Sequence, residues 1–537
     1  MSQSGIKNLL KRRKIEIYLN MLLMMTFLIL GSILRADGIA YTLTAYMFME
    51  FVWCLIGSKT TDALSKMIRS ACAKGQFDHV KATAKRVMSV QGLISLFASV
   101  VFAAAAIPIS GSLVHMPNAA SIMVGFAPLF FLRTLSASIT GKFSGKGNEI
   151  QAVVSGIVRQ ILFLVLSLSV MMYFVRYGEK VSDLLQQDTF RGMYGGLGVA
   201  IAAVITELII LCILIVRNAK DKTNPGKNKE VSKYTEPVPN TLKVFYKTMW
   251  QDALIGALVI LMFLDGAVCF MRNVADANVG LVQYGIFIGR LIPLLLCVSL
   301  PIMAFFLEIT IRGITFLKKD DESRGKFCLK SGIHLGLIHS LFAAVFLIVM
   351  AEPLSSMISG EQQQLFVRLI RYGAFLIPVC TFLYMFCKIL MFLGKKLIVI
   401  GSLVFMNLLY IIFLIVGLKG EAPDPGVLVI GAVAATSFAL IIVGYLCFCM
   451  IRFRLSEFII LGIPVGAAVV SGLLQVLLYK FIGPHLGSIM TLLITMIISV
   501  TVYWILLFMS GNVSEQELRL SPLGSRIYQL GHTFHMV

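Results

Sequence analysis

Charged side chains are scarce inside the long apolar runs of this sequence, and five of them stand out: Glu50, Arg133, Glu207, Asp265 and Arg290. A guanidinium group binds phosphate oxygens through two parallel hydrogen bonds, whereas a carboxylate can neutralise that guanidinium or carry a proton or a cation. Because charge is costly in hydrocarbon, such groups usually face a protein interior or a water-filled cavity. These five residues are therefore the candidates for binding chemistry.

Position along the apolar runs sorts four of these residues into two couples. Glu50 and Arg133 lie at similar depth in an early pair of runs, and Asp265 and Arg290 lie at similar depth in a later pair. Two interpretations stay open: each couple fixes neighbouring helices together, or both arginines face a cavity and bind an anionic substrate. Glu207 has no obvious partner in the sequence. We interpret it as a protonated or helix-bonded glutamate, or as an ion-coupling group together with Asp265.

Composition identifies the apolar runs as membrane spans. Of the 537 residues, 58% are hydrophobic and only 14% are charged, which excludes a water-soluble protein. The runs are about 17 to 25 residues long, which lets a helix cross about 30 Å of hydrocarbon. The net charge of +20 does not indicate nucleic-acid binding, because Lys and Arg occupy short intervals between runs rather than one folded surface. The sequence predicts an all-α polytopic membrane protein.

Basic residues also predict the topology. We count fourteen apolar runs, and 35 of the 47 Lys and Arg residues fall in alternate intervals that begin with the N-terminal one, against 9 in the other intervals. Because Lys and Arg accumulate on the cytoplasmic side of membrane proteins, we expect fourteen transmembrane helices with both termini in the cytoplasm.

Domain organisation follows from the intervals. Residues 217–247 are rich in Lys, Asn and Pro and predict a cytoplasmic linker between an N-terminal lobe of helices 1–6 (1–216) and a C-terminal lobe of helices 7–12 (248–450). Helices 13 and 14 (451–510) and a cytoplasmic tail (511–537) complete the chain. Interval 57–86 predicts helix extensions around a turn at Gly75. The segment LRADGIAYTLTAY (34–46) is faintly echoed by RNVADANVGLVQYG (272–285), as a parallel internal repeat predicts.

Motifs for enzymatic chemistry are absent from the sequence. It has no Walker-type phosphate loop, no paired His/Glu metal spacing and no nucleophile elbow. The ten cysteines lie in apolar runs or basic intervals, so neither a disulfide framework nor a metal site is expected. His334 and His339 are interpreted as core or cavity-lining polar residues. We expect a protein that is not an enzyme and has no cofactor, with any transport coupled to sodium, protons or the membrane potential.

Four segments carry a resemblance to a known family. They are DALSKMIRSACAKGQFDHVKATAKRVM (62–88), APLFFLRTLSASITGKFSGKGNEIQAVVSGIVRQI (127–161), YGIFIGRLIPLLLCVSLPIMAFF (284–306) and SGNVSEQELRLSPLGSRIYQL (510–530). Their order and spacing resemble the multidrug/oligosaccharidyl-lipid/polysaccharide (MOP) superfamily of flippases, especially its lipid II flippase and stage V sporulation protein B-like branches. The count of fourteen helices supports the resemblance to these branches, whereas drug-exporting relatives usually have twelve helices. In this resemblance Arg290 matches the arginine implicated in binding a lipid-linked pyrophosphate.

The resemblance implies a function. It implies a flippase of the bacterial cytoplasmic membrane that moves a polyprenyl-diphosphate-linked saccharide by alternating access, with helices 13 and 14 forming a groove for the lipid tail. Arg133, Arg290, Glu50 and Asp265 would bind the substrate, and Asp265 and Glu207 would couple ions. Lipid II flippases carry an Arg-Asp pair within helix 1, whereas Arg35 and Asp37 here fall in the turn after it, which puts a peptidoglycan precursor as the substrate in question.

Two rival functions stay open. An ion-coupled exporter of small cationic compounds, from the same superfamily, would work through Asp265, Glu207 and Glu50. An integral-membrane glycosyl- or acyltransferase is disfavoured, because no large exterior loop carries a catalytic acid or His cluster. The expected partners of the flippase are membrane lipids, the lipid-linked saccharide and glycan-synthesis proteins, not nucleic acid, and we expect a monomer.

Overall fold

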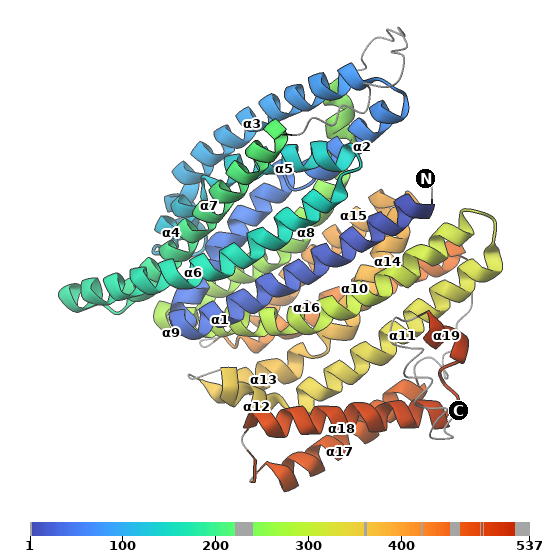
Figure 1. The fold of residues 1–537 in the computed structure, drawn as a ribbon. Helices are drawn as coiled ribbons and strands as arrows, with labels where there is room; N and C mark the ends of the chain where they lie inside the picture. Colours follow the sequence, from blue (N-terminus) through green and yellow to red (C-terminus); the bar gives the residue numbers. More distant parts are fainter. Residues whose placement is uncertain are drawn as a thin grey trace. The chain divides into compact units, whose positions relative to one another are not determined.

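The computed structural model describes residues 3–220, 240–358, 362–419, 423–451, 462–483, 485–486 and 488–520. Every regular element within these ranges is a helix (Figure 1). The chain divides into two compact units: Met1–Leu19, Ile29–Gly289 and Leu418–Pro423 form the first, and Asn20–Leu28, Arg290–Gly417 and Asp424–Val537 form the second. Residues 221–239 of the predicted linker and 521–537 of the predicted tail lie outside the described residues.

The first unit contains the helices that precede Arg290, apart from a short stretch of α1. They are α1 (Gln3–Ile56), α2 (Thr60–Ala73), α3 (Phe77–Pro108), the π-helical turn η1 (Ile109–Leu113), α4 (Ala119–Phe126), α5 (Leu129–Gly145), α6 (Glu149–Leu185), α7 (Thr189–Lys220), α8 (Thr241–Asn273), α9 (Ala277–Ile286) and the start of the π-helical turn η2 (Phe287–Leu291).

The second unit contains the later helices. They are α10 (Ile292–Leu317), α11 (Glu322–Val349), α12 (Ala351–Ile358), α13 (Gln363–Gly373), α14 (Leu376–Phe392), α15 (Lys396–Gly417), α16 (Gly426–Ile451), α17 (Ile463–Ile482), α18 (Ser488–Met509) and α19 (Glu515–Arg519).

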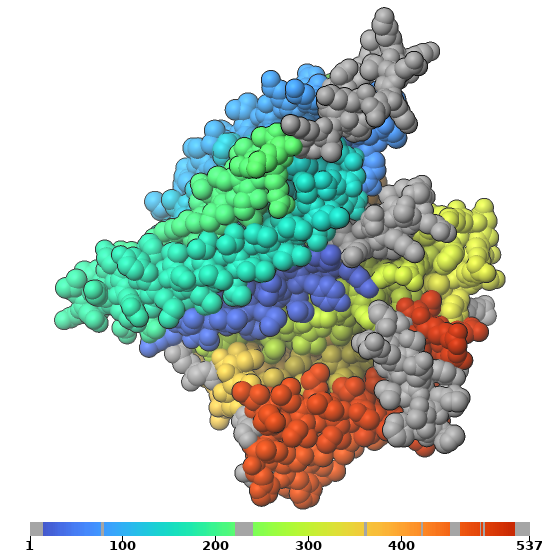
Figure 2. Space-filling view, viewed as in Figure 1, coloured from blue at the N-terminus to red at the C-terminus, as the bar shows by residue number. Residues whose placement is uncertain are grey.

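Thirteen helical segments of the described residues are long and apolar enough to cross a membrane. Their outward surfaces suit a lipid environment: on α17 and α18, for example, Leu473, Phe481 and Ile497 are each more than 60% exposed. Figure 2 shows both helices at the surface of the second unit. The prediction of an all-helical, multi-pass membrane protein is confirmed.

The first of these segments, Lys14–Ala73, reverses direction at Arg35. Arg35 has φ 62° and ψ 179°, which interrupts the helix within α1. A Cβ added at Gly31 would lie 3.5 Å from the Ile39 side chain, whereas eight residues of straight helix rise about 12 Å. The helices on either side of Arg35 therefore pack against each other, and Arg35 lies in a turn, as expected.

The two segments of the predicted internal repeat meet at this turn. A Cβ at Gly285 would lie 1.8 Å from the carbonyl oxygen of Ala36, and one at Gly289 would lie 2.4 Å from Ile39 Cγ2. The missing side chains let the backbone of α9 and η2 approach α1 closely, which is how helices associate where lipid provides no hydrophobic drive.

Glycines on α7 let this helix pack closely against α1, α4 and α6. A Cβ at Gly195 would meet Leu34 at 2.3 Å, and one at Gly196 would meet Ile122 and Thr42 at 2.5 Å. On α6, a Cβ at Gly178 would lie 2.9 Å from the carbonyl oxygen of Phe190. The α6–α7 hairpin is therefore tightly packed, although its far end stands out from the other helices of this unit (Figure 2).

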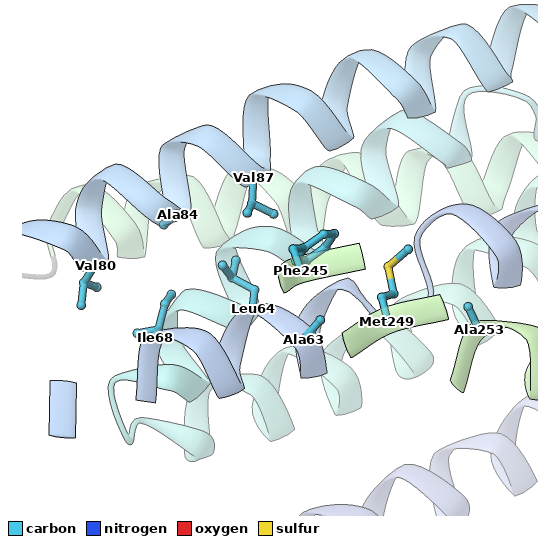
Figure 3. Close-up of a cluster of buried hydrophobic side chains, with 9 residues drawn as sticks. All are labelled: Ala63, Leu64, Ile68, Val80, Ala84, Val87, Phe245, Met249 and Ala253. Carbon is cyan, nitrogen blue, oxygen red and sulfur yellow. The ribbon is translucent and has the colours of Figure 1, made fainter. Parts of the chain in front are cut away.

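The predicted helix extensions of interval 57–86 are α2 and the start of α3. They join at Gly75, whose φ of 73° favours glycine, so the predicted turn is confirmed. Apolar residues of α2, α3 and α8 form one buried cluster (Figure 3), which comprises Ala63, Leu64, Ile68, Val80, Ala84, Val87, Phe245, Met249 and Ala253. The amphipathic pattern of α2 thus serves packing inside the first unit.

A polar cluster attaches the end of the chain to α11 in the second unit. His334 Nδ1 lies 3.5 Å from Glu517 Oε1, and Asn512 Nδ2 lies 3.2 Å from His334 Nε2. Ser514 caps α19 by a reciprocal capping box with Glu517. His334 and Glu517 are 2% and 7% exposed. His334 is thus a buried polar residue, as expected, and α19 is held by hydrogen bonds as well as by packing.

Gly285→Ala should disrupt the first unit, because its methyl group would occupy the space of the Ala36 carbonyl. We expect little folded protein after detergent extraction, judged by gel filtration and thermal unfolding. Gly401→Ala on α15 is the matched control, because nothing lies within 4 Å of its added Cβ. Equal recovery of both variants would contradict the close approach of Gly285 and Ala36.

Acidification should loosen α19. Burial by itself would raise the pKa of Glu517, but hydrogen bonds from His334 and Ser514 and attraction to His334 hold that pKa below its ordinary value of 4.5. A lowered pKa gives stability that is present above pH 4.5 and is lost as the pH falls through the folded value. Amide hydrogen exchange in α19, corrected for its intrinsic pH dependence, should therefore accelerate below pH 4.5. In Glu517→Gln, exchange should be faster at neutral pH and depend less on acidification; an unchanged pH profile would refute this role.

Candidate functional site

Glu50 and Arg133 form an ion pair inside the first unit. Arg133 Nη1 of α5 donates to Glu50 Oε1 of α1, and each side chain is 20% exposed. Tyr46, one turn before Glu50 on α1, faces both groups. The sequence-based expectation that this acid and this arginine meet is therefore confirmed.

Small polar residues on α5 bring this helix close to its neighbours. Thr134, Ser136 and Ser138 are buried, and their hydroxyls donate to carbonyl oxygens four residues earlier at 2.7, 3.0 and 2.9 Å. Hydroxyls bonded in this way need no partner on another helix, and short side chains permit a close helix–helix approach. The Arg133 side chain is thereby positioned against α1 and α7.

Glu207 has a partner, contrary to the expectation from sequence. Arg159 of α6 donates from Nε to Glu207 Oε2 at 2.8 Å and from Nη2 to Oε1 at 3.1 Å, a bidentate pair. Glu207 is 2% exposed, whereas the Arg159 side chain is 35% exposed. The sequence did not reveal this pairing, because α6 and α7 lie antiparallel and their register is not visible in a linear sequence.

The two ion pairs belong to one electrostatic network. Arg133 lies close enough to attract the carboxylate of Glu207 as well as that of Glu50, and Ser136 of α5 also faces Glu207. Charges of alternating sign thus run from Glu50 through Arg133 and Glu207 to Arg159, across helices α1, α5, α7 and α6. The network has no net charge, so an incoming anion must compete with a carboxylate for an arginine.

Asp265 lies in α8 of the first unit, and its surroundings differ from those of Glu50 and Glu207. Within the part of the chain that the structure describes, its Oδ2 is buried and has no hydrogen-bond partner. A carboxylate oxygen buried in this way is unfavourable unless a proton, a cation or water completes it. Arg290 belongs to the second unit, so its expected pairing with Asp265 stays a prediction.

Arg290 is positioned by an irregular backbone. It lies in the π-helical turn η2, is 4% exposed, and precedes Pro293 in the first turn of α10. Single π-helical turns interrupt the regular hydrogen-bond ladder and occur frequently at functional sites. Residues Leu291 and Leu295 that follow it pack against Gly373 at the end of α13, whose added Cβ would lie 3.2 and 3.0 Å from them.

Comparison with known proteins finds similarity in fold only. No protein-family model matches the sequence, and no curated protein matches it either. The lipid II flippase MurJ, in an inward closed conformation, matches with a TM-score of 0.63 and 13% identity over 91% of this chain and 98% of that chain. An inward-facing multidrug resistance MATE family transporter of the MOP superfamily matches with a TM-score of 0.60 and 13% identity over 81% and 94%. The MATE transporter VcmN of Vibrio cholerae matches with a TM-score of 0.55 and 15% identity over 84% and 98%.

These similarities confirm the resemblance at the level of fold. The chain has the fold shared by MATE transporters and the MurJ flippase of the MOP superfamily. The matched proteins are membrane transporters and a flippase, not enzymes.

Glu207→Gln should destabilise the first unit. Removing this charge leaves Arg159 without its carboxylate partner and leaves Glu50 as the remaining acid beside Arg133, and we expect a loss of about 1–3 kcal/mol because Glu207 is 2% exposed while Arg159 is 35% exposed. Thermal unfolding in nanodiscs measures the effect. The control is Glu179→Gln, whose pair with Arg191 at 3.2 Å is more exposed and should contribute about 0–1 kcal/mol. Equal shifts of the unfolding temperature in the two variants would show that the Glu207–Arg159 pair contributes no more to stability than the Glu179–Arg191 pair.

Proposed function

We propose that this protein is a flippase that moves a polyprenyl-diphosphate-linked saccharide across the bacterial cytoplasmic membrane by alternating access. The observation that carries the proposal is the presence of arginines in the helical segments of a flippase-like fold, with Arg290 only 4% exposed and the Arg133 side chain 20% exposed. A diphosphate with several sugars cannot cross hydrocarbon unaided, so it needs a polar, cationic path. The match to MurJ covers 91% of this chain, more than the matches to the two MATE transporters.

The proposed topology has fourteen transmembrane helices and both termini in the cytoplasm. The turn at Arg35 supports this count, because it divides the first of the thirteen apolar segments into two helices of membrane-spanning length. Residues 1–216 and 248–450 would be the two lobes that alternately expose the substrate site, joined by linker 217–247. Helices 13 and 14 (451–510) would hold the lipid tail, followed by the cytoplasmic tail (511–537).

Arg133 and Arg290 are the proposed diphosphate ligands. The pairing of Arg133 with Glu50 supports a cycle in which Glu50 neutralises the arginine until a phosphate replaces it. Asp265 would have the corresponding role toward Arg290. Because no phosphate-hydrolysing motif is present in the sequence, we do not propose an enzymatic activity, and the protein would act as a monomer with membrane lipids and glycan-synthesis proteins as partners.

Ion coupling is assigned to Asp265 and Glu207. The buried Oδ2 of Asp265, which has no hydrogen-bond partner among the described residues, supports this assignment, because a proton or a sodium ion would complete it. For Glu207 the assignment requires that its bidentate pair with Arg159 opens during the cycle. Protons, sodium or the membrane potential are the candidate driving forces.

An ion-coupled exporter of small cationic compounds is the second candidate. The matches to MATE transporters favour it, and the acids Glu50, Glu207 and Asp265 would then bind the cation. The neutralisation of two of these acids by arginines argues against it, because a cation would have to displace a guanidinium. Drug-dependent dissipation of a proton or sodium gradient in proteoliposomes would favour this function.

Flipping is tested in proteoliposomes that contain a lipid-linked oligosaccharide and an external glycan-modifying enzyme. We expect protein-dependent modification of the internal pool, and its absence would refute the flippase proposal. In Arg290→Ala, flipping should fall about 10- to 100-fold, because a charge-assisted contact to the diphosphate is lost.

The control is Arg312→Ala on α10, the helix that follows η2. The Arg312 side chain is 47% exposed and pairs with Glu308 one turn away, so flipping should be unchanged. Full flipping activity of a folded Arg290→Ala protein would show that Arg290 does not bind the diphosphate.

A further inference from the structure

An open cavity of about 590 Å³, with polar side chains in its lining, lies between α12 and α13 of the second unit. Helices α12 and α13 contact each other (Figure 1), and Ser355 Oγ donates to the carbonyl oxygen of Gln363 at 3.2 Å, which ties the two helices together. The side chains that line the cavity include those of Glu352, Gln364, Val367, Arg368, Arg371 and Tyr372.

The amphipathic sequence of α13 creates this cavity. Phe366, Leu369 and Ile370 are 0% exposed and pack into the unit, which turns the polar residues of the same helix outward. Gln364 and Arg371 lie seven residues apart, or about two helical turns, and therefore share the outer face. The polar lining is a direct result of burying the opposite face.

Two ion pairs hold the arginines of the cavity in place. Arg371 Nη2 donates to Glu352 Oε1 of α12 at 2.8 Å, and Arg368 Nη2 donates to Asp424 Oδ1 at 2.7 Å. Each arginine therefore has a carboxylate partner, and the two pairs add no net charge. A guanidinium keeps several N–H donors after one contact, and a carboxylate keeps free lone pairs, so both pairs can still bind a ligand.

These groups suit a neutral sugar better than an anion. A saccharide presents hydroxyls that both donate and accept, which matches arginines, carboxylates and the amide of Gln364 side by side. Tyr372, 38% exposed, adds an aromatic ring with a polar tip, which can cover an apolar sugar face. Both ion pairs are exposed to solvent, so a phosphate would gain little by displacing Glu352 or Asp424 from its arginine, whereas a sugar hydroxyl can bind beside both partners without displacing either.

The cavity adjoins the backbone that positions Arg290. Tyr372 is followed by Gly373, which packs on Leu291 and Leu295 as described above. Helices α10 and α11 are joined at their other ends by the turn at residues 318–321, so the cavity lies at the end of this hairpin opposite to that turn. In the proposed topology this is the exterior end.

We infer that the α12–α13 cavity, through Arg368, Arg371, Gln364 and Tyr372, binds the neutral saccharide part of the transported substrate at the exterior side. This inference rests on the proposed flippase function. In this arrangement Arg290 would bind the diphosphate of the substrate, and the cavity would bind its sugars. The lipid-linked product would thus be held by its glycan after translocation.

Saturation-transfer NMR on the full-length protein in nanodiscs tests this inference with defined probes. The probes are maltose, lactose and N,N′-diacetylchitobiose as neutral disaccharides, and inorganic phosphate and glycerol phosphate as anions. We expect saturation transfer to at least one disaccharide and none to the anions. Binding of glycerol phosphate without any disaccharide would assign the cavity to anionic lipid headgroups, and no binding of any probe would also overturn the inference.

Tyr372→Ala should weaken disaccharide binding about fivefold or more, because the aromatic cover is lost. Tyr445→Ala, on α16, is the matched control, since Tyr445 is 68% exposed and does not line the cavity. Gln364→Ala provides a second variant at an exposed position, in case Tyr372→Ala fails to fold. Undiminished binding in both cavity variants would overturn the inference.

The proteoliposome assay separates failure of the inference from failure of the proposed function. Flipping without disaccharide binding would refute the cavity site and leave the flippase standing. Tyr372-dependent disaccharide binding without flipping would support the cavity as a saccharide site and refute the flippase function. Flipping of wild-type protein that slows in Tyr372→Ala would support both.

Discussion

A charge inside hydrocarbon has no water to bind, and this constraint governs the arrangement of the first unit. Glu50, Arg133, Glu207 and Arg159 come from four different helices, and each finds its opposite charge on a neighbouring helix. Because an unpaired member would cost several kcal/mol, the register of α1, α5, α6 and α7 cannot shift independently. Because the charges are paired, a ligand that binds the arginine or the carboxylate of one pair leaves the other group without its partner.

Close backbone approach is what makes this pairing geometrically possible. Glycines on α6, α7, α9 and η2 occur where an added Cβ would collide with a neighbouring helix, and short hydroxyl residues on α5 have the same effect. Lipid tails are as apolar as leucine, so helices gain little by hiding apolar surface from lipid and associate through close packing instead. The contact of Gly285 with Ala36 shows this at the turn where the two halves of the faint sequence repeat meet.

One fold here is compatible with two transport chemistries, because MATE transporters and the MurJ flippase share it. The distribution of charge distinguishes between them. Acids left open would suit a cationic drug, whereas acids already paired with arginines leave the guanidinium as the group that a substrate anion can claim. In the described part of the first unit, Glu50 and Glu207 are paired with arginines, and Asp265 has an oxygen without a hydrogen-bond partner. Under the proposed function, this pattern supports an anionic substrate, with Asp265 as the acid available to a proton or cation.

The sequence by itself determined that the chain is an all-helical membrane protein, which residues carry charge inside the membrane, and that Gly75 and Arg35 lie in turns, because hydropathy and turn chemistry are local properties. It also paired Glu50 with Arg133, since depth within a span can be counted along the chain. Only the tertiary structure decided that Glu207 pairs with Arg159, that Glu517 lies beside His334, and that α12 and α13 line an open cavity with polar side chains. These contacts depend on how each helix is rotated about its axis and shifted along it. Close packing between glycines that are distant in the sequence fixes both, and no local sequence pattern specifies them.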